Sequence, residues 1–121
     1  MKKIIAGLLI LICVFTCASN ALFVNAAHVI SDTRSVRKDG NWTNGYFIFT
    51  STASINMQTK DIYLTDRSFT PYTALGESFR KKTYWTRPGN NPGEMYSVAQ
   101  CYEYLYGIQF AQLRTSVYHM P

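Results

Sequence analysis

Catalytic nucleophiles need a general base within hydrogen-bond reach, so cysteine and histidine are the first residues to consider. The chain has two histidines, His28 and His119, and Cys101 opens the aromatic stretch CYEYLYGIQF. Cys101 and His119 could form a dyad across a hairpin, but chain termini fray and support a general base poorly. We therefore predict that Cys101 is a small buried hydrophobic residue in a β-layer. The alternative is an exposed thiol that joins two copies by an intermolecular disulfide.

Carboxylates, metals and phosphates give no stronger signal. Asp61 and Asp66 bracket a short stretch and Glu103 lies among tyrosines, and we expect all three to be solvated charges at strand ends rather than a glycosidase pair. No His and Cys residues have metal-ligand spacing. The glycines of RPGNNPG, residues 87–93, alternate with prolines and precede no helix, unlike a phosphate-binding loop. The sequence thus predicts a non-enzymatic protein without catalytic residues, cofactor or metal.

The segment FRKKTYWTRPG combines cationic and aromatic side chains that could bind a ligand. Cationic groups attract phosphate or anionic headgroups, while aromatic rings stack on sugars or lie at a bilayer interface. The competing interpretation is a charged edge strand that discourages aggregation. The surface-binding residues that we predict are Arg80, Lys81, Lys82, Tyr84, Trp85 and Arg87.

The N-terminus has the pattern of a secretory signal peptide. Two lysines precede an apolar run from Ile4 to Phe15, and a stretch of small residues follows. The run is short for a membrane span, which needs roughly 20 apolar residues. We expect cleavage after Val24-Asn25-Ala26, with Ser19-Asn20-Ala21 as the second choice. Residues 1–26 are thus predicted to form a signal helix that directs secretion.

Charge and cysteine content limit what the exported part can be. Twelve Lys and Arg against seven Asp and Glu give +5, which falls to +3 when Lys2 and Lys3 leave with the signal. This mild charge suits an anionic cell-wall polymer or membrane surface and is far from the dense basic footprint of a nucleic-acid binder. Cys13 and Cys17 also leave, so Cys101 has no intramolecular disulfide partner. The remaining chain is long enough for one small domain.

Alternating apolar and polar residues predict mainly β-structure along this domain. Phe47, Phe49, Ser51, Ala53 and Ile55 would share the face of one strand, and Phe79, Lys81, Thr83 and Trp85 that of another. We expect a flexible N-terminal arm over 27–44, with a turn at 39–41, followed by a strand over 45–55 and a turn over 56–60. A short strand over 61–65, closed by Asp66-Arg67, comes next, and then an edge strand or irregular loop over 68–78. A strand over 79–86 and a loop over 87–93 complete this part of the domain.

The last segment, residues 94–119, fits two patterns. Helical spacing places Val98, Cys101 and Leu105 on one face. Against a helix stand the dense aromatic residues and Gly107, since an interior glycine costs about 1 kcal/mol relative to alanine. We favour two strands, with Gly107 in a tight turn or bulge. The whole then forms an all-β domain over 45–121, an antiparallel sandwich or half-open barrel of five to seven strands.

Two stretches resemble a known group of proteins. VRKDGNWTNGYFIFTST, residues 36–52, and YEYLYGIQFAQLR, residues 102–114, are similar to segments of small secreted Gram-positive β-rich proteins of unknown function. The resemblance implies secretion and a β-rich fold, and it brings no catalytic residues. We therefore expect a secreted protein that binds at the cell surface or envelope through its basic-aromatic segment. The alternative is a bacteriocin-like antagonistic peptide.

Overall fold

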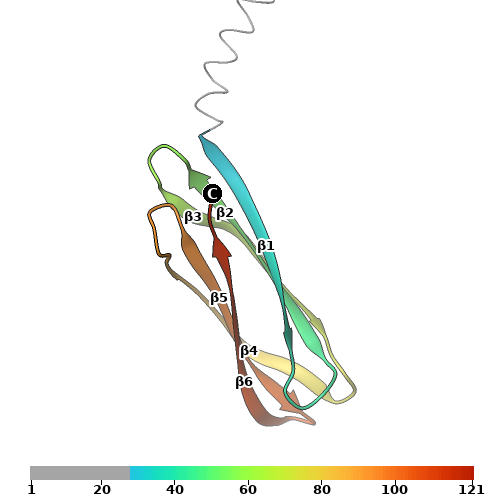
Figure 1. Ribbon diagram of the computed structural model, residues 1–121. Helices are drawn as coiled ribbons and strands as arrows, with labels where there is room; N and C mark the ends of the chain where they lie inside the picture. Colours follow the sequence, from blue (N-terminus) through green and yellow to red (C-terminus); the bar gives the residue numbers. More distant parts are fainter. Residues whose placement is uncertain (1–27) are drawn as a thin grey trace, which may run out of the picture.

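The computed structural model describes residues 28–121 and shows six antiparallel strands in two sheets packed face to face (Figure 1). The strands are β1 (Val29–Asp39), β2 (Tyr46–Asn56), β3 (Ile62–Tyr72), β4 (Glu77–Pro88), β5 (Met95–Leu105) and β6 (Ile108–His119). The sheet orders are β1-β2-β3 and β4-β5-β6. The all-β class and the sandwich-like arrangement are confirmed, and the two sheets do not close into a barrel. The predicted signal peptide, 1–26, lies outside the described residues.

The core lies between the central strands of the two sheets. The predicted inward face of β2 is confirmed, because Phe47, Phe49, Ser51, Ala53 and Ile55 are all fully buried. The side chains that join Phe47 and Phe49 in the core are Phe79, Ala99, Cys101, Leu113 and Val117. The Phe47 ring stacks on Phe69 at 4.4 Å between centroids and meets Phe79 edge-on at 5.3 Å. Aromatic pairs in these geometries stabilise a core beyond the area that they bury.

The predicted flexible arm over 27–44 is wrong, because residues 29–39 form β1. All eleven residues of β1 pair with β2, from Val29–Asn56 to Asp39–Tyr46. Its half-buried positions are Ile30, Asp32, Arg34, Val36 and Lys38, so charged residues interrupt the apolar alternation that a sequence pattern would detect. Polar residues are tolerated there because they find partners inside the structure. The turn expected at 39–41 lies further along, over 40–45, because Asp39 still pairs with Tyr46, and the backbone N–H of Gly40 donates to the carbonyl of Gly45.

The third strand is longer than predicted. Asp66 and Arg67 do not close it but continue it to Tyr72, because Thr65 is a bulged residue that restores the pairing with β2. Pro71 is accommodated because β3 lies at the edge of its sheet. The expected turn over 56–60 is present, with the side chain of Asn56 accepting from the backbone N–H groups of Gln58 and Thr59.

A bulge in β4 changes which side chains share a face. The register shifts between Arg80 and Thr83, and Lys81 within the bulge has a φ of 56°. Before the bulge Phe79 points inward, whereas after it Tyr84 points inward and stacks on Phe49 at 6.0 Å. The strict alternation predicted for 79–86 is therefore wrong beyond Arg80, because Lys81 and Lys82 lie opposite the single residue Cys101 and this one extra residue reverses the faces of the second half of the strand.

The last segment forms two strands, as favoured, and not a helix. Leu105 pairs with Ile108, which leaves Tyr106-Gly107 as a two-residue turn with φ values of 49° and 79°. Positive φ at both central residues is the geometry of a type I′ hairpin turn, which matches the twist of antiparallel strands. Gly107 thus occupies the tight turn predicted for it.

Substitution of Gly107 should act through its backbone alone, because a Cβ there would meet no atom within 4 Å. We expect Gly107→Ala to lower the free energy of unfolding by about 1 kcal/mol, since left-handed backbone is costly for most L-residues. Gly107→Asn should cost less, because asparagine tolerates that region. Urea unfolding of the three proteins measures both values. Equal losses in the two variants would contradict the turn geometry as the cause.

Candidate functional site

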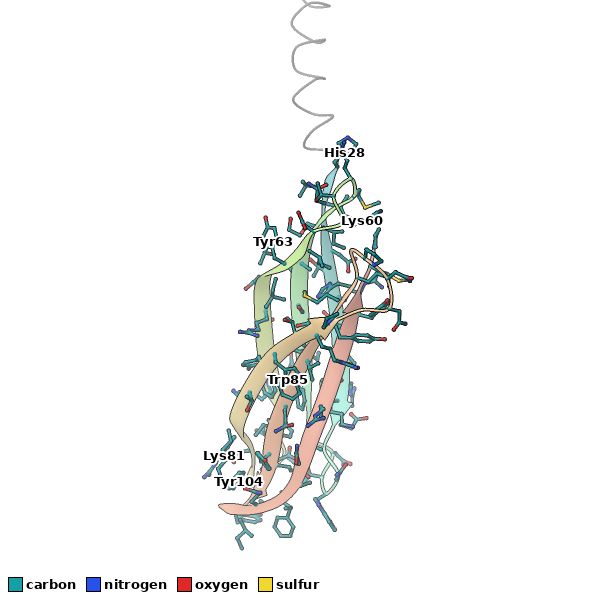
Figure 2. All side chains as sticks on the ribbon, turned by 90° about the vertical axis from the view of Figure 1, so that its left-hand side faces the viewer. His28, Lys60, Tyr63, Lys81, Trp85 and Tyr104 are labelled. Atoms are coloured by element: carbon teal, nitrogen blue, oxygen red, sulfur yellow. The ribbon has the colours of Figure 1, made fainter. Side chains whose placement is uncertain are left out.

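The outer face of the β4-β5-β6 sheet carries most of the predicted binding segment. Side chains from the three strands form cross-strand rows, because paired residues in an antiparallel sheet lie on the same face. One row joins Arg87, Tyr96 and Tyr118, and the next joins Trp85, Val98 and Ser116. Figure 2 views this face, with Trp85 midway along it and Lys81 and Tyr104 near the lower end.

The arginines at the upper half of this face lie over aromatic rings. The guanidinium carbon of Arg87 is 4.2 Å from the centroid of the Tyr96 ring, and that ring lies 4.4 Å from the ring of Tyr118. The guanidinium carbon of Arg114 lies 5.1 Å from the Trp85 ring, and its Nη2 donates to Gln100 Oε1 at 2.8 Å. Cation–π contacts of this kind hold the long side chains in place without neutralising their charge.

The lower half of the face repeats this arrangement. The guanidinium carbon of Arg80 lies 4.8 Å from the ring of Tyr104, whose hydroxyl donates to Gln109 Oε1 at 3.0 Å. The bulge turns the ammonium group of Lys81 to within 5.7 Å of the Tyr102 ring and 5.8 Å of the Tyr104 ring. Its interaction with Tyr104 raises the pKa of Lys81 above its usual value, so this amine is fully charged at neutral pH.

The outer face has four cations and no strand carboxylate in the described part of the chain. The only acidic residues within β4, β5 and β6 are Glu77 and Glu103, and both are buried. Glu94, just before β5, lies at the margin and accepts a hydrogen bond from the Tyr118 hydroxyl. The four cations therefore exceed the one marginal carboxylate, Glu94, and the face can attract an anionic ligand.

The structure divides the six residues predicted from the sequence. Arg80, Lys81, Trp85 and Arg87 belong to the outer face, whereas Lys82 and Tyr84 do not. The Lys82 ammonium lies 4.5 Å from the ring of Phe69 in the other sheet. The face also includes residues that the sequence analysis missed, namely Tyr96, Tyr102, Tyr104, Arg114 and Tyr118. The alternation of tyrosines in 102–106 could have shown that these rings share a face. The position of Arg114 on the same face could be found only from the register in which β6 pairs with β5.

Cys101 and His119 do not form the dyad considered above. Cys101 is fully buried in the core, as the packing interpretation predicted, and burial raises the pKa of its thiol to about 12. His119 is also fully buried, so the expectation of a frayed terminus is wrong. It is held because it pairs with Met95 and faces β1 and β2.

Sequence analysis also missed a buried polar network around His119. Its Nδ1 lies 2.9 Å from Asp32 Oδ2, and its Nε2 lies 2.9 Å from Ser51 Oγ. The residue types are those of a serine hydrolase triad, but Ser51 and His119 have no exposed surface. The network instead joins β6 to β1 and β2 across the sandwich. Burial disfavours ionised Asp32, but hydrogen bonds from Arg34 and His119 outweigh it and lower the Asp32 pKa.

A second missed cluster is the carboxyl pair Glu77 and Glu103, at the opposite end of the sandwich. Glu103 is fully buried, which corrects its assignment as a solvated strand-end charge. Its Oε1 accepts from the backbone N–H of Asn41 at 3.1 Å, whereas Oε2 has no partner other than the neighbouring acid. Burial and the hydrogen bond with Glu77 raise the pKa of Glu103. Repulsion from the nearby Glu77 carboxyl adds to this effect, because like charges in a buried pair are unfavourable.

Neither cluster has the composition of a metal centre. Within residues 28–121, no group of three or more His, Cys, Asp or Glu side chains is placed to hold a metal ion. The same residues contain no helix with the length and apolar character needed to cross a membrane. No protein-family model, curated protein or solved structure matches the chain. The strongest candidate site is therefore the cationic-aromatic outer face.

The raised pKa of Glu103 predicts how stability depends on pH. Unfolded glutamate ionises near pH 4.3, while the folded protein holds the Glu103 proton to higher pH. This group should therefore destabilise the fold progressively as pH rises from about 4.3 through its folded pKa. We expect Glu103→Gln to gain in melting temperature relative to the native protein across that window. Glu94→Gln is the control and should not show this trend.

Asp32 should act in the opposite direction, because its pKa is lowered on folding. Its ionised form stabilises the fold above the unfolded value of about 3.9, and this contribution is lost as pH falls through the folded pKa. We expect Asp32→Asn to lower the free energy of unfolding by about 1–3 kcal/mol at pH 7. The difference from the native protein should shrink below pH 4. A deficit that stays constant with pH would show that the charge is not involved.

Proposed function

We propose that this protein is exported and acts without catalysis, by binding an anionic polymer of the cell envelope through the β4-β5-β6 outer face. The observation that carries the proposal is the placement of Arg80, Lys81, Arg87 and Arg114 against aromatic rings on a face without strand carboxylates. Export is supported by the signal-peptide pattern of residues 1–26.

The chemistry of the face suits a polymer that carries both phosphate and sugar or polyol units. Arginine presents a planar set of N–H donors that matches phosphate geometry, and tyrosine and tryptophan rings provide flat surfaces for stacking. A depression of about 410 Å³ on this face is lined by Trp85, Arg114 and Val98, among other residues. An extended chain could place an anionic group on Arg114 and a neighbouring unit against Trp85.

Preorganisation favours a specific role for these cations over a merely solubilising one. Arg114 is fixed by Gln100 as well as by Trp85, and Arg80 donates to Ser78 Oγ at 3.0 Å. Side chains that are already ordered lose less entropy when a ligand binds. β4 and β6 are both edge strands, so the competing edge-strand explanation covers their cations as well, but it does not account for the reach of Arg114 across the face to the Trp85 ring on β4.

The proposal predicts that neutralising two of the arginines weakens binding to a phosphate polymer. We expect Arg87→Gln/Arg114→Gln to reduce affinity for poly(glycerol phosphate) about tenfold or more at 50 mM salt, since each lost charge contact contributes about 1 kcal/mol. Calorimetry or a fluorescence titration measures the change. Lys60→Gln is a matched control, because Lys60 is an exposed cation in the 57–61 turn at one end of the molecule (Figure 2).

Neutral dextran separates charge recognition from general sugar binding. The native protein should bind poly(glycerol phosphate) with an affinity that falls steeply with salt, and should bind dextran weakly or not at all. Equal affinity of the native protein and the double variant, or a loss of affinity in Lys60→Gln as large as in the double variant, would overturn the assignment of this face.

An antagonistic, bacteriocin-like role is the second candidate. It is favoured by the large apolar side chains exposed at one end of the sandwich, among them Trp42 and Leu75, because membrane-active proteins need such a surface. A growth-inhibition assay on related bacteria distinguishes the two roles. A passive binder leaves growth unchanged, whereas an antagonist slows growth in a dose-dependent manner.

A further inference from the structure

Large apolar side chains are exposed together at one end of the sandwich. Six of the nine exposed large hydrophobic residues in the described chain lie there, with exposed fractions between 48% and 90%. These six residues, called the apolar end below, are Trp42, Tyr72, Leu75, Tyr106, Ile108 and Phe110. Scattered single apolar residues are normal on protein surfaces, but a cluster of this kind marks an interaction site.

Three connections meet at this end and bring residues distant in sequence together. They are the turns 40–45, 73–76 and 106–107, which Figure 1 shows at the end of the sandwich opposite the C-terminus. The backbone N–H of Tyr106 donates to the carbonyl of Gly76 at 2.7 Å. The ring of Trp42 packs at 5.8 Å from that of Phe110. Phe110 is the residue left unpaired by the bulge in β6, which turns it out of the ladder.

Buried groups behind the apolar end hold its turns in place. The carboxyl pair accepts hydrogen bonds from Asn41, Thr43 and Ala74, which belong to two of the three turns. A Cβ at Gly40 would lie 2.1 Å from Glu103 Oε2, and one at Gly45 would lie 1.5 Å from Glu77 Oε1. A side chain at either glycine would therefore have to displace a carboxyl group, which shows how closely the turn packs over the acids. The exposed side chains of the apolar end therefore project from turns that hydrogen bonds to the carboxyl pair hold in place.

Cations surround the apolar end on both sheets. Arg80 and Lys81 lie beside it on the second sheet, in the rows next to Tyr104. On the first sheet Arg37 lies 3.7 Å from the ring centroid of Tyr46, and Tyr46 stacks on Tyr72 at 4.9 Å. The one exposed carboxylate in the neighbouring residues of β1 and its turn is Asp39, which pairs with Arg37.

From this arrangement we propose that the apolar end docks the protein on an anionic lipid bilayer, with Trp42, Leu75 and Ile108 entering the interface. Tryptophan and tyrosine favour the headgroup level, and aliphatic side chains favour the acyl boundary beneath it. The surrounding cations add about 1 kcal/mol each near an anionic surface. This surface borders the outer face proposed to bind polymer at Arg80 and Lys81, but it uses different rings.

A second copy of the chain is the competing occupant, and the charges argue against it. Two apolar ends brought together would place Arg80 and Lys81 of both copies near one another, and the exposed carboxylate of the neighbouring turn, Asp39, is already paired with Arg37. Like charges directly opposed at an interface are unfavourable. An anionic bilayer removes this repulsion and covers the same apolar surface.

The two tryptophans of the chain allow each surface to be tested separately. Trp85→Phe leaves Trp42 as the reporter of the apolar end, and Trp42→Phe leaves Trp85 as the reporter of the outer face. The probe is vesicles of phosphatidylglycerol and phosphatidylcholine in equal amounts, with and without brominated acyl chains. We expect Trp42 fluorescence to shift to the blue and to be quenched by the brominated lipid, and Trp85 to be quenched little.

Charge substitution provides the matched pair of variants. Leu75→Asp should lower vesicle partitioning about tenfold, since it removes one inserted aliphatic side chain and adds a negative charge. Leu75 is 90% exposed, so the fold should tolerate the change. Tyr63→Asp places the same charge on an exposed residue toward the opposite end of β3 (Figure 2) and should leave partitioning unchanged.

The outcomes separate this proposal from the polymer-binding proposal. Quenching of Trp85 instead of Trp42, or equal partitioning of Leu75→Asp and the native protein, would overturn docking by the apolar end. Sedimentation velocity without lipid tests the second-copy alternative: a dimer that Leu75→Asp converts to a monomer would also overturn it. Failure to bind poly(glycerol phosphate) would refute the polymer-binding function and leave the Trp42 result standing.

Discussion

The two sheets share no ladder of backbone hydrogen bonds, so side chains between them must hold the sandwich together. Apolar packing does this in the middle, around Phe47 and Phe49. At one end the link is His119 with Asp32 and Ser51, and at the other it is the Glu77–Glu103 pair with the β1–β2 turn. The core is thus closed at both ends by polar contacts that have directional geometry. Such contacts specify how the sheets align, which apolar packing alone does weakly.

This inward use of acidic residues determines the character of the outer surface. Because Glu77 and Glu103 are buried, the strands of the second sheet present cations without carboxylates. The bulge at Lys81 adds to the effect by turning Trp85 and Lys81 outward while Tyr84 completes the core. A bulge that re-aims side chains in this way is a common device near binding surfaces. The same residues that stabilise the interior therefore shape the candidate site.

Sequence patterns identified the parts of the fold in which apolar alternation or turn chemistry is explicit. The inward face of β2 and the turn at Gly107 follow directly from residue type. β1 was missed because its inner positions include the charged residues Asp32 and Arg34, which pair with each other, and the other partner of Asp32 is His119 near the far end of the chain. The alternation of β4 failed at the bulge, which has no local signature. The part of the candidate site on β4 was predicted from the sequence. The part on β6 was not, because the position of Arg114 beside Trp85 depends on strand register.

The two proposed surfaces meet at Arg80 and Lys81, which border both the outer face and the apolar end. The apolar end lies at the tip of the long axis of the sandwich, and the outer face runs along that axis (Figure 1). A molecule docked by its tip would therefore hold the outer face upright above the headgroups, open to polymers that extend from the membrane. Cations shared by the two surfaces cannot be fully engaged by lipid and polymer at once. Binding at one surface should then weaken the electrostatic part of binding at the other. The coupling free energy must be the same whichever ligand binds first, because linkage between two sites is reciprocal.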